Sequence, residues 1–521
     1  MIEKCKNIKL QLFILLTVSL LIKLWGICSF ELIYEEAYYL TYANYPAISQ
    51  FDHAPMVGFM VLFTTLGMIL KSTFFLRLGP LLFGMGSVIF IYMLGKKYRN
   101  KRTGLIAAYM ASINIYVFMY CGMFIMPDNA MLFFFLVSFY FFSNIMLDDA
   151  SKAKKKDIFF AFLFFGLAIY SKYQAIYIGS GVLLYIIFFN RVWFKKISIY
   201  IATIIPLIFI GLIVYGSYLL NFAGLAYQDN RIHTSLADLS FGHLGQQISA
   251  QIAVTNGINF VIIVLAIIFF KKKKFMPKKY FWLILFVSVP LILTVLYISL
   301  FGGTNAQWTG PAYAILLIIG AAYLDSVLKT LKFPVIVTYV VLALFIYPMG
   351  AVSLGWYYPS KLLNRGISQI RYGRNDLRLF LYGQEQARQV YDKFVKENPQ
   401  YENLPLVSFS WRTTANLNFY IGKPEKRDVY TFGGLGDMHT YYWIDKTYPK
   451  LKAGSNAIYM TLTYKYVVPD TRFYNKAVLL RKVPIYMFGE IVEYLYIYEM
   501  QGYKPDKMNI LERFIDQSRF G

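Results

Sequence analysis

The chain is poor in cysteine and in charged residues. Its three cysteines, Cys5, Cys28 and Cys121, have the spacing of neither a metal site nor a disulfide framework. Only 15% of the 521 residues are charged, whereas 58% are hydrophobic. Apolar runs of about 20 residues recur through the first two thirds of the chain. This composition excludes a single water-soluble core and predicts a polytopic membrane protein.

Acidic residues are scarcer still, with 28 Asp and Glu against 52 Lys and Arg and a formal net charge of +24. Such a charge can indicate nucleic-acid binding, but here the basic residues gather in short clusters between apolar runs. Every second loop is basic, which is typical of cytoplasmic loops, so we expect no nucleic-acid partner. The clusters lie at residues 4–9, 96–102, 152–156, 191–196, 271–279 and 329–332.

The apolar runs predict a transmembrane domain over residues 1–352 with about eleven helices (11–13). No small-residue cleavage site follows the first run, so we interpret it as an uncleaved helix. The first outer loop is residues 31–73. Within it, the run at residues 56–70 is shorter than the ~20 residues of a span, so it should lie on the membrane surface or re-enter.

The remaining residues, 353–521, are richer in charge and contain no run long enough to span. Helical periodicity at residues 377–396 and strand-like runs at 406–409, 457–460 and 477–480 predict a soluble α/β domain. An inside N-terminus and an odd number of spans place this domain on the extracytoplasmic side. An even number of spans would leave it in the cytoplasm.

Carboxylates concentrate in the first outer loop, where Glu35 and Glu36 precede Tyr38. On a helix two adjacent residues point about 100° apart, so only one of the pair can easily face a given cleft. A carboxylate beside lipid has its pKa raised by desolvation, which suits a general base. The alternative is an ordinary solvated acidic loop.

Two further ionisable residues lie near membrane depth. Asp128 follows Pro127 between two apolar spans, where it should face a cavity or a partner; a simple turn is the alternative. Lys172 lies in a turn that only about 21 Å of helix separates from the cytoplasmic side, so we expect its ammonium to be buried beside an anion such as a lipid phosphate. Snorkelling to the interface is the alternative.

The later motifs are weaker. A lone histidine such as His243 is usually a surface residue whose ring nitrogens have hydrogen-bond partners. Trp308, which follows Gln307, fits the interfacial aromatic belt as well as it fits sugar stacking. We find no P-loop, no GxGxxG and no convincing Asp-x-Asp, which favours a lipid-linked sugar donor over a nucleotide one.

Together these motifs resemble the bacterial polyprenyl-phosphate-sugar glycosyltransferases of the GT-C fold. That group includes the family 39, protein O-mannosyltransferase-like enzymes and the aminoarabinose transferases that modify lipid A. The resemblance covers residues 10–325. Its motifs are EEAYY at 35–39, FDHAPM at 51–56, PD at 127–128, SKY at 171–173, GH at 242–243 and WTGPAY at 308–313.

The resemblance implies a transferase in the bacterial inner membrane that uses a sugar linked to polyprenyl (undecaprenyl) phosphate. The acceptor would be lipid A, another glycolipid or glycan, or a protein hydroxyl. Glu35 or Glu36 would deprotonate or orient the acceptor hydroxyl for an inverting attack. The family usually has Asp where this chain has Glu35, so Glu36 remains a candidate.

The resemblance also implies roles for other residues. Asp128 would orient the acceptor or the site, and Lys172 and His53 would hold the donor phosphate. The expected substrate-binding residues are Tyr38, Gln307 and Trp308, and a divalent metal ion would lie between Asp52 and His243.

Three other functions compete with this one. A lipid-linked sugar flippase or transporter is favoured by internal repeats or by broken helices in matching halves, which the sequence does not show. A non-catalytic assembly protein would tolerate loss of the carboxylates. An oligosaccharyltransferase or polymerase of the same fold would differ in donor length and acceptor.

Overall fold

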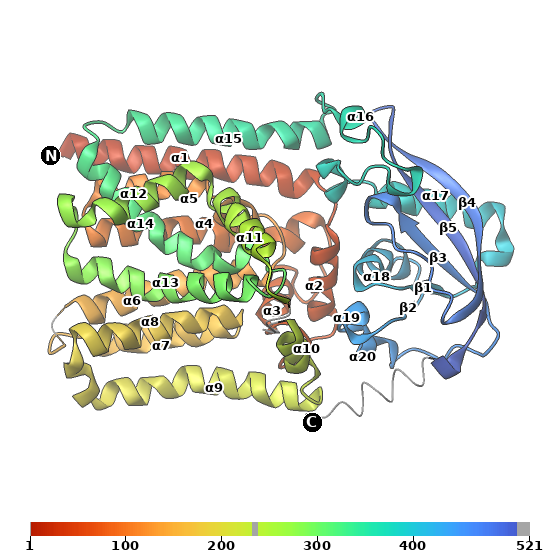
Figure 1. The fold of residues 1–521 in the computed structure, drawn as a ribbon, viewed down its shortest axis with the longest axis horizontal. Helices are drawn as coiled ribbons and strands as arrows, with labels where there is room; N and C mark the ends of the chain where they lie inside the picture. Colours follow the sequence, from red (N-terminus) through yellow and green to blue (C-terminus); the bar gives the residue numbers. More distant parts are fainter. Residues whose placement is uncertain (1, 149, 232–237, 508–521) are drawn as a thin grey trace. The chain divides into compact units, whose positions relative to one another are not determined.

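The computed structural model describes residues 2–148, 150–231 and 238–507, which form two compact units (Figure 1). Most of the helices belong to the first unit, and a five-stranded sheet belongs to the second. The first unit comprises Met1–Ile27, Tyr42–Gly216 and Gln228–Phe345. The second comprises Cys28–Thr41, Ser217–Tyr227 and Ile346–Gly521.

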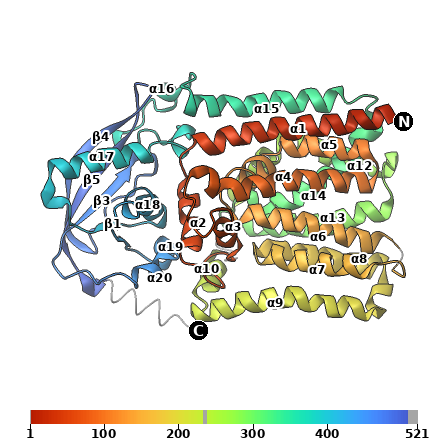
Figure 2. The same ribbon diagram turned by 180° about the vertical axis from the view of Figure 1, so that it is seen from behind.

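The first unit is a bundle of apolar helices. Helices α6, α7 and α4 pack against one another, as do α5, α12 and α14. Helices α1 and α15 run side by side in both views (Figures 1 and 2). The helices are α1 (Ile2–Ser29), α3 (Met56–Thr64), α4 (Thr73–Tyr98), α5 (Lys101–Ser112), α6 (Pro127–Leu147), α7 (Lys155–Ile169), α8 (Ile176–Phe189), α9 (Ile197–Leu219), α11 (Phe241–Thr255), α12 (Gly257–Lys273), α13 (Lys278–Ser299), α14 (Gly310–Val327) and α15 (Lys332–Ser353).

Seven described helices are long and apolar enough to cross a membrane, or eight if the pair α11 and α12, bent by 100°, is one span. This confirms a polytopic helical membrane protein, while the predicted count of eleven stays a prediction. Three helices expected to span have only 12, 15 and 14 residues, namely α5, α7 and α8. Helix α3, within the predicted surface segment, has nine residues, fewer than the ~20 that a span needs.

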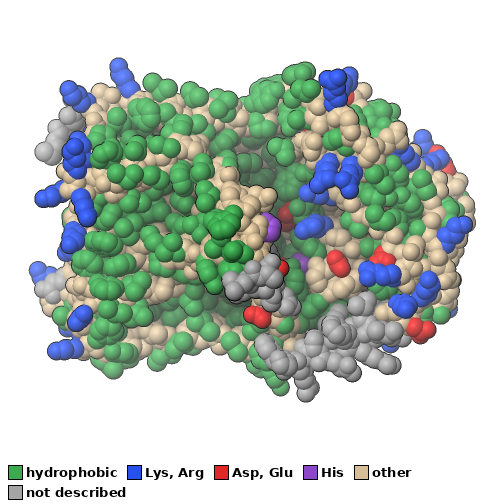
Figure 3. All heavy atoms as spheres, in the orientation of Figure 1, with side chains coloured by type: hydrophobic (Ala, Val, Ile, Leu, Met, Phe, Trp, Pro, Cys, Tyr) green, Lys and Arg blue, Asp and Glu red, His purple; other side chains and the backbone are tan. Residues whose placement is uncertain are grey.

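Hydrophobic side chains cover the flank of the first unit, and Lys and Arg gather at the end where the N-terminus lies (Figure 3). Part of this basic cluster is structural. The buried carboxylate of Asp325, in α14, lies 3.0 Å from Arg99 Nε and 3.1 Å from an Arg102 Nη. Asn100 and Thr103 also donate to it, at 2.8 and 2.9 Å. The start of α5 is thereby fixed to the end of α14.

The second unit is built on a mixed sheet with strand order β2-β1-β3-β5-β4. Strand β1 pairs in parallel with β2 and β3, whereas β5 pairs antiparallel with β3 and β4, Ala457 lying opposite Met500. The strands are β1 (Leu406–Ser408), β2 (Val429–Thr431), β3 (Ala457–Leu462), β4 (Tyr474–Met487) and β5 (Glu490–Tyr503). The helices are α2 (Tyr34–Asn44), α10 (Ala223–Arg231), α16 (Ser360–Leu363), α17 (Gln384–Glu397), α18 (Trp411–Leu417), α19 (Leu435–Met438) and α20 (Tyr441–Asp445), of which α2 and α10 extend past the unit boundary.

Residues 28–41 belong to the second unit because their backbone is bonded into it. The Leu32 N–H donates to the Tyr420 hydroxyl at 2.8 Å. The Glu31 carboxylate accepts from the Gln384 N–H at 2.7 Å and so caps the start of α17. The segment that follows the first apolar helix is therefore part of the sheet-containing unit, although the sequence places it more than 300 residues away.

Two elements of this unit differ from the sequence prediction. The helix predicted at 377–396 begins at Gln384, because Gly383 adopts a φ of 108° that a helix cannot contain. The strand predicted at 477–480 extends over Tyr474–Met487 and pairs with β5, which was not predicted. A two-residue turn at positive φ, Phe488 and Gly489, joins the two strands.

Candidate active site

A buried ion pair joins Asp128 and Lys172 in the first unit. Asp128 lies in the first turn of α6 after Pro127, where both the proline and an acidic residue are favourable. Lys172 Nζ is 2.8 Å from Asp128 Oδ2, and the two residues are 5% and 3% exposed. The Tyr116 hydroxyl donates to Oδ1 at 3.0 Å. Both carboxylate oxygens are thus occupied, whereas Lys172 has no second acceptor among the described residues.

The turn that carries Lys172 also holds the first-loop motif in place. The Tyr170 hydroxyl donates to the carbonyl of Ile48 at 2.8 Å. Tyr173, directly after Lys172, has a side-chain hydrogen bond with Ser49. These contacts bring residues 48–49 against residues 170–173.

Asp52 and His53 follow in the same loop. The Asp52 carboxylate accepts from the Tyr42 hydroxyl and lies 4.0 Å from His53 Nε2. Gln228 donates to the Asp52 carbonyl at 2.9 Å. The structure therefore places Asp52 and His53 in the loop that contacts the Lys172 turn, as members of one region of the first unit.

Gln307 and Trp308 lie in a 3₁₀ turn, Ala306–Thr309, that leads into α14. Trp308 packs on an apolar cluster formed by Leu291, Val295 and Ala312. At Gly310 a Cβ would lie 2.5 Å from the ring of Tyr116, the residue that bonds Asp128, so only glycine permits this approach. The turn is thus close to Tyr116, which bonds Asp128. The packing of Trp308 agrees with an interfacial position, and its predicted contact with a substrate stays a prediction.

Glu36, in the second unit, caps a helix. It is the third residue of α2, it is fully buried, and its Oε2 accepts from the Ile33 N–H at 3.1 Å. This is one half of a capping box, which stabilises a helix N-terminus. Glu36 therefore has a structural role as a helix cap.

Glu35 points elsewhere. Its carboxyl accepts a hydrogen bond from the Tyr34 hydroxyl and is attracted by Arg412 and Lys465. Its Oε2 is buried and has no hydrogen-bond partner among the described residues. Burial raises the pKa of Glu35 to about 7, against the opposing effects of Tyr34 and the two cations. Its carboxyl can therefore gain or lose a proton near neutral pH, as a general base must.

Tyr38 lies on α2 in an aromatic cluster of the second unit. Its ring centroid is 5.0 Å from Trp411, 5.7 Å from His439 and 6.1 Å from Tyr441. Such packing orders α2 against the sheet domain. The substrate-binding role predicted for Tyr38 stays a prediction.

Comparisons with known proteins agree with this arrangement. Residues 52–215, which contain Asp52, His53, Asp128 and Lys172, match the family model described as dolichyl-phosphate-mannose-protein mannosyltransferase. The crystal structure of ArnT from Cupriavidus metallidurans in the apo state superposes with a TM-score of 0.60 at 12% identity, covering 93% of this chain and 97% of ArnT. The same protein bound to undecaprenyl phosphate gives 0.58 at 12% identity over the same shares. The chain has the GT-C fold. No curated protein sequence matches it.

The predicted resemblance and the glycosyltransferase class are thereby confirmed for this GT-C chain. An identity of 12% carries the fold and no residue's role. The predicted metal site between Asp52 and His243 stays a prediction as well. His243 lies in the first turn of α11, which starts at Phe241, and its Nδ1 is buried without a hydrogen bond, but no group of three or more metal-ligating side chains occurs within the described ranges.

Sequence reasoning missed two kinds of residue. Tyr116 lies in an apolar run, and nothing in the sequence marks it as a site residue. The same holds for Arg412 and Lys465, which only the fold brings near Glu35.

The sequence did mark Lys23, because a lysine within an apolar span usually has a function. Its Nζ is buried over the Phe118 ring at 4.8 Å and has no hydrogen-bond partner in the described part of the chain.

Breaking the Asp128–Lys172 pair should destabilise the first unit. Asp128→Asn leaves a buried ammonium without its counter-charge, which typically costs about 3–5 kcal/mol. We expect a lower thermal midpoint in nanodiscs, and partial recovery when Lys172→Met removes the orphaned charge as well. Asp157→Asn, a carboxylate with no ion pair, is the control. Equal midpoints for the single and double variants would contradict a true ion pair.

Glu35 should also make stability depend on pH. Its pKa is about 7 in the folded protein against an ordinary value of 4.5, so the folded state holds the proton more tightly. The contribution of Glu35 to the free energy of unfolding is fully present below pH 4.5, falls as the pH rises and is lost above about pH 7. Glu35→Gln should therefore raise the thermal midpoint more at pH 8 than at pH 5. The exposed Glu402→Gln is the control, and a gain independent of pH would exclude a raised pKa.

Proposed function

We propose that this membrane glycosyltransferase moves a sugar from a polyprenyl-phosphate donor to an acceptor hydroxyl at the outer face of the bacterial inner membrane. The Asp128–Lys172 pair carries the proposal. It holds a buried ammonium with hydrogens available for a phosphate, in a loop cluster that includes His53. The ArnT structure with undecaprenyl phosphate supports it, because that protein, which shares this fold, holds such a lipid.

In the proposed reaction the acceptor hydroxyl attacks the anomeric carbon in line and inverts it, while the polyprenyl phosphate leaves. Lys172 and His53 hold the phosphate and stabilise its developing charge. Asp128 holds the Lys172 ammonium in position. Glu35, with a pKa of about 7, takes the proton from the acceptor hydroxyl. Tyr38, Gln307 and Trp308 are proposed to contact the substrates.

The acceptor in this proposal is lipid A, another glycolipid or glycan, or a protein hydroxyl. Lys and Arg gather at one end of the helical unit (Figure 3). We propose that this end faces the cytoplasm, as the positive-inside rule favours. With eleven spans the sheet-containing unit is then extracytoplasmic. A transporter is less well supported, because within the described residues one helix pair alone, α11 and α12, is sharply bent, and no matching half contains a second.

Neutralising the base tests the proposal. We expect Glu35→Gln to lower sugar transfer from labelled polyprenyl-phosphate hexoses and aminosugars into membrane fractions by ~10²–10⁴. The rate of the wild type should fall as the pH drops below about 7, the pKa of Glu35, and the variant should lack this dependence. Glu36→Gln should lose less, because its amide oxygen still accepts from the Ile33 N–H.

Glu402→Gln, an exposed carboxylate of the second unit, is the matched control and should transfer at the wild-type rate. Wild-type rates for both the Glu35 and the Glu36 variants would rule out a carboxylate base. A Glu36→Gln variant that is silent while Glu35→Gln is active would reassign the base to Glu36.

A further inference from the structure

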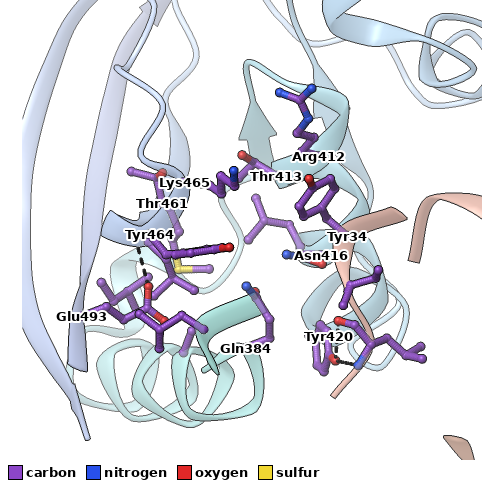
Figure 4. Close-up of a pocket in the computed structure, with 18 of the residues that line it drawn as sticks. Tyr34, Gln384, Arg412, Thr413, Asn416, Tyr420, Thr461, Tyr464, Lys465 and Glu493 are labelled. Atoms are coloured by element: carbon purple, nitrogen blue, oxygen red, sulfur yellow. Dashed lines mark hydrogen bonds between the residues drawn. The ribbon is translucent and has the colours of Figure 1, made fainter. Parts of the chain in front are cut away.

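A pocket of the second unit is lined by Tyr34, the residue before Glu35, and is not explained by the chemistry above (Figure 4). It encloses about 770 Å³ of empty space, its open mouth included. Tyr34 and the start of α18 line one wall, and β3, β5 and the turn after β3 line the other. Because this volume includes open solvent, the groups that line the pocket, and not its size, are what indicate a ligand.

Two cations at this pocket form no direct ion pair. Arg412 and Lys465 both line it, and neither has an ion pair or a hydrogen bond with a described residue. Glu35 attracts both of them, but only at longer range. Arg412 lies over the rings of Tyr34 and Trp411, 5.8 and 5.1 Å from their centroids. Because burial and repulsion by Arg412 both lower the pKa of Lys465, an anion placed between the two cations would be attracted to this site.

Deeper in the pocket, acceptors lack donors. The Oδ1 of Asn416 and the Oε1 of Glu493 belong to residues that line the pocket, and both atoms are buried with no hydrogen-bond partner among the residues that the structure describes. The other oxygen of Glu493 accepts from the Tyr464 N–H at 3.3 Å, which fixes the side chain (Figure 4). Buried acceptors of this kind cost free energy unless a donor reaches them. Hydroxyl groups are suitable donors, and Tyr34 and Tyr464 offer ring surfaces to a sugar.

We propose that this pocket binds an anionic saccharide. Its phosphate or carboxylate lies between Arg412 and Lys465, and its hydroxyls donate to Asn416 and Glu493. The binding is a property of the second unit, whereas the role of the saccharide as the acceptor rests on the function proposed above. In that role one of its hydroxyls lies within reach of Glu35, whose carboxyl is attracted by the same two cations.

Binding to the full-length protein in nanodiscs of uncharged lipid tests the inference, since sugar-based detergents would compete. The probes are glucose 6-phosphate, glucuronate, glucose and inorganic phosphate, measured by isothermal titration calorimetry. We expect at least one anionic sugar to bind at least about tenfold more tightly than glucose, because hydrogen bonds to charged groups are the stronger ones. The preferred probe identifies the anion as a phosphate or a carboxylate.

Variants locate the site. Arg412→Gln/Lys465→Gln should weaken the preferred anionic sugar at least about tenfold, whereas the charge-conserving Arg412→Lys/Lys465→Arg should retain most of the affinity. Arg365→Gln/Lys396→Gln, two exposed cations that do not line the pocket, is the matched control. Asn416→Leu should weaken the anionic sugar but not inorganic phosphate.

Several outcomes would overturn the inference. Equal affinity for glucose and the anionic sugars would exclude an anion site. Equal affinity for inorganic phosphate and glucose 6-phosphate, unaffected by Asn416→Leu, would leave an anion site without sugar recognition. Unchanged binding in the Gln double variant would place the site elsewhere. If the wild type binds the anionic sugar but transfers no sugar, the proposed function is wrong and the pocket stands. If it transfers sugar but binds none of the anionic probes, the pocket is wrong and the proposed function stands.

Discussion

The ion pair between Lys172 and Asp128 is the interaction on which the first unit depends. In an apolar bundle neither charge can be left alone, because an unpaired buried ion is far more costly than a paired one. The pair ties the start of α6 to the turn after α7, and the same turn holds residues 48–49. A second such group, Asp325 with Arg99 and Arg102, fixes the end of α14 to the start of α5. The loops at residues 48–53 and 170–173 are thus held in place by the need to pair the charges of Asp128 and Lys172 inside the bundle.

The adjacent carboxylates of α2 show how local structure separates two residues that the sequence leaves equivalent. Glu36 stands three residues after Ile33, the position from which a side chain reaches back to cap the helix. Glu35, turned by one residue, cannot reach that N–H and instead meets Tyr34, Arg412 and Lys465. The capping bond therefore fixes the orientation of α2 and leaves Glu35 as the carboxyl with an unbonded oxygen.

The parts of the structure that could be predicted are those set by local pattern. Apolar runs and basic clusters indicated the helical unit, and the PD and SKY motifs indicated Asp128 and Lys172. Their direct pairing could not be predicted, because 44 residues separate them. Helix α17 begins late because Gly383 takes a positive φ, which the composition alone does not reveal. Strand β5 was missed, since its length follows from pairing with β4. Arg412 and Lys465 gave no signal, because only the folded sheet brings them to Glu35.

The proposed pocket and the proposed base are electrostatically linked. Arg412 and Lys465 lower the pKa of Glu35, opposing the burial that raises it to about 7. An anion bound between the two cations would offset their charge, so the pKa of Glu35 would rise further and its carboxylate would become a stronger base. The same shift leaves a smaller fraction of the Glu35 carboxyl ionised at a given pH, so occupation of the pocket by an anion would move proton acceptance by Glu35 to higher pH. A neutral saccharide in the same pocket would leave the charge of the two cations unopposed and would not produce this shift.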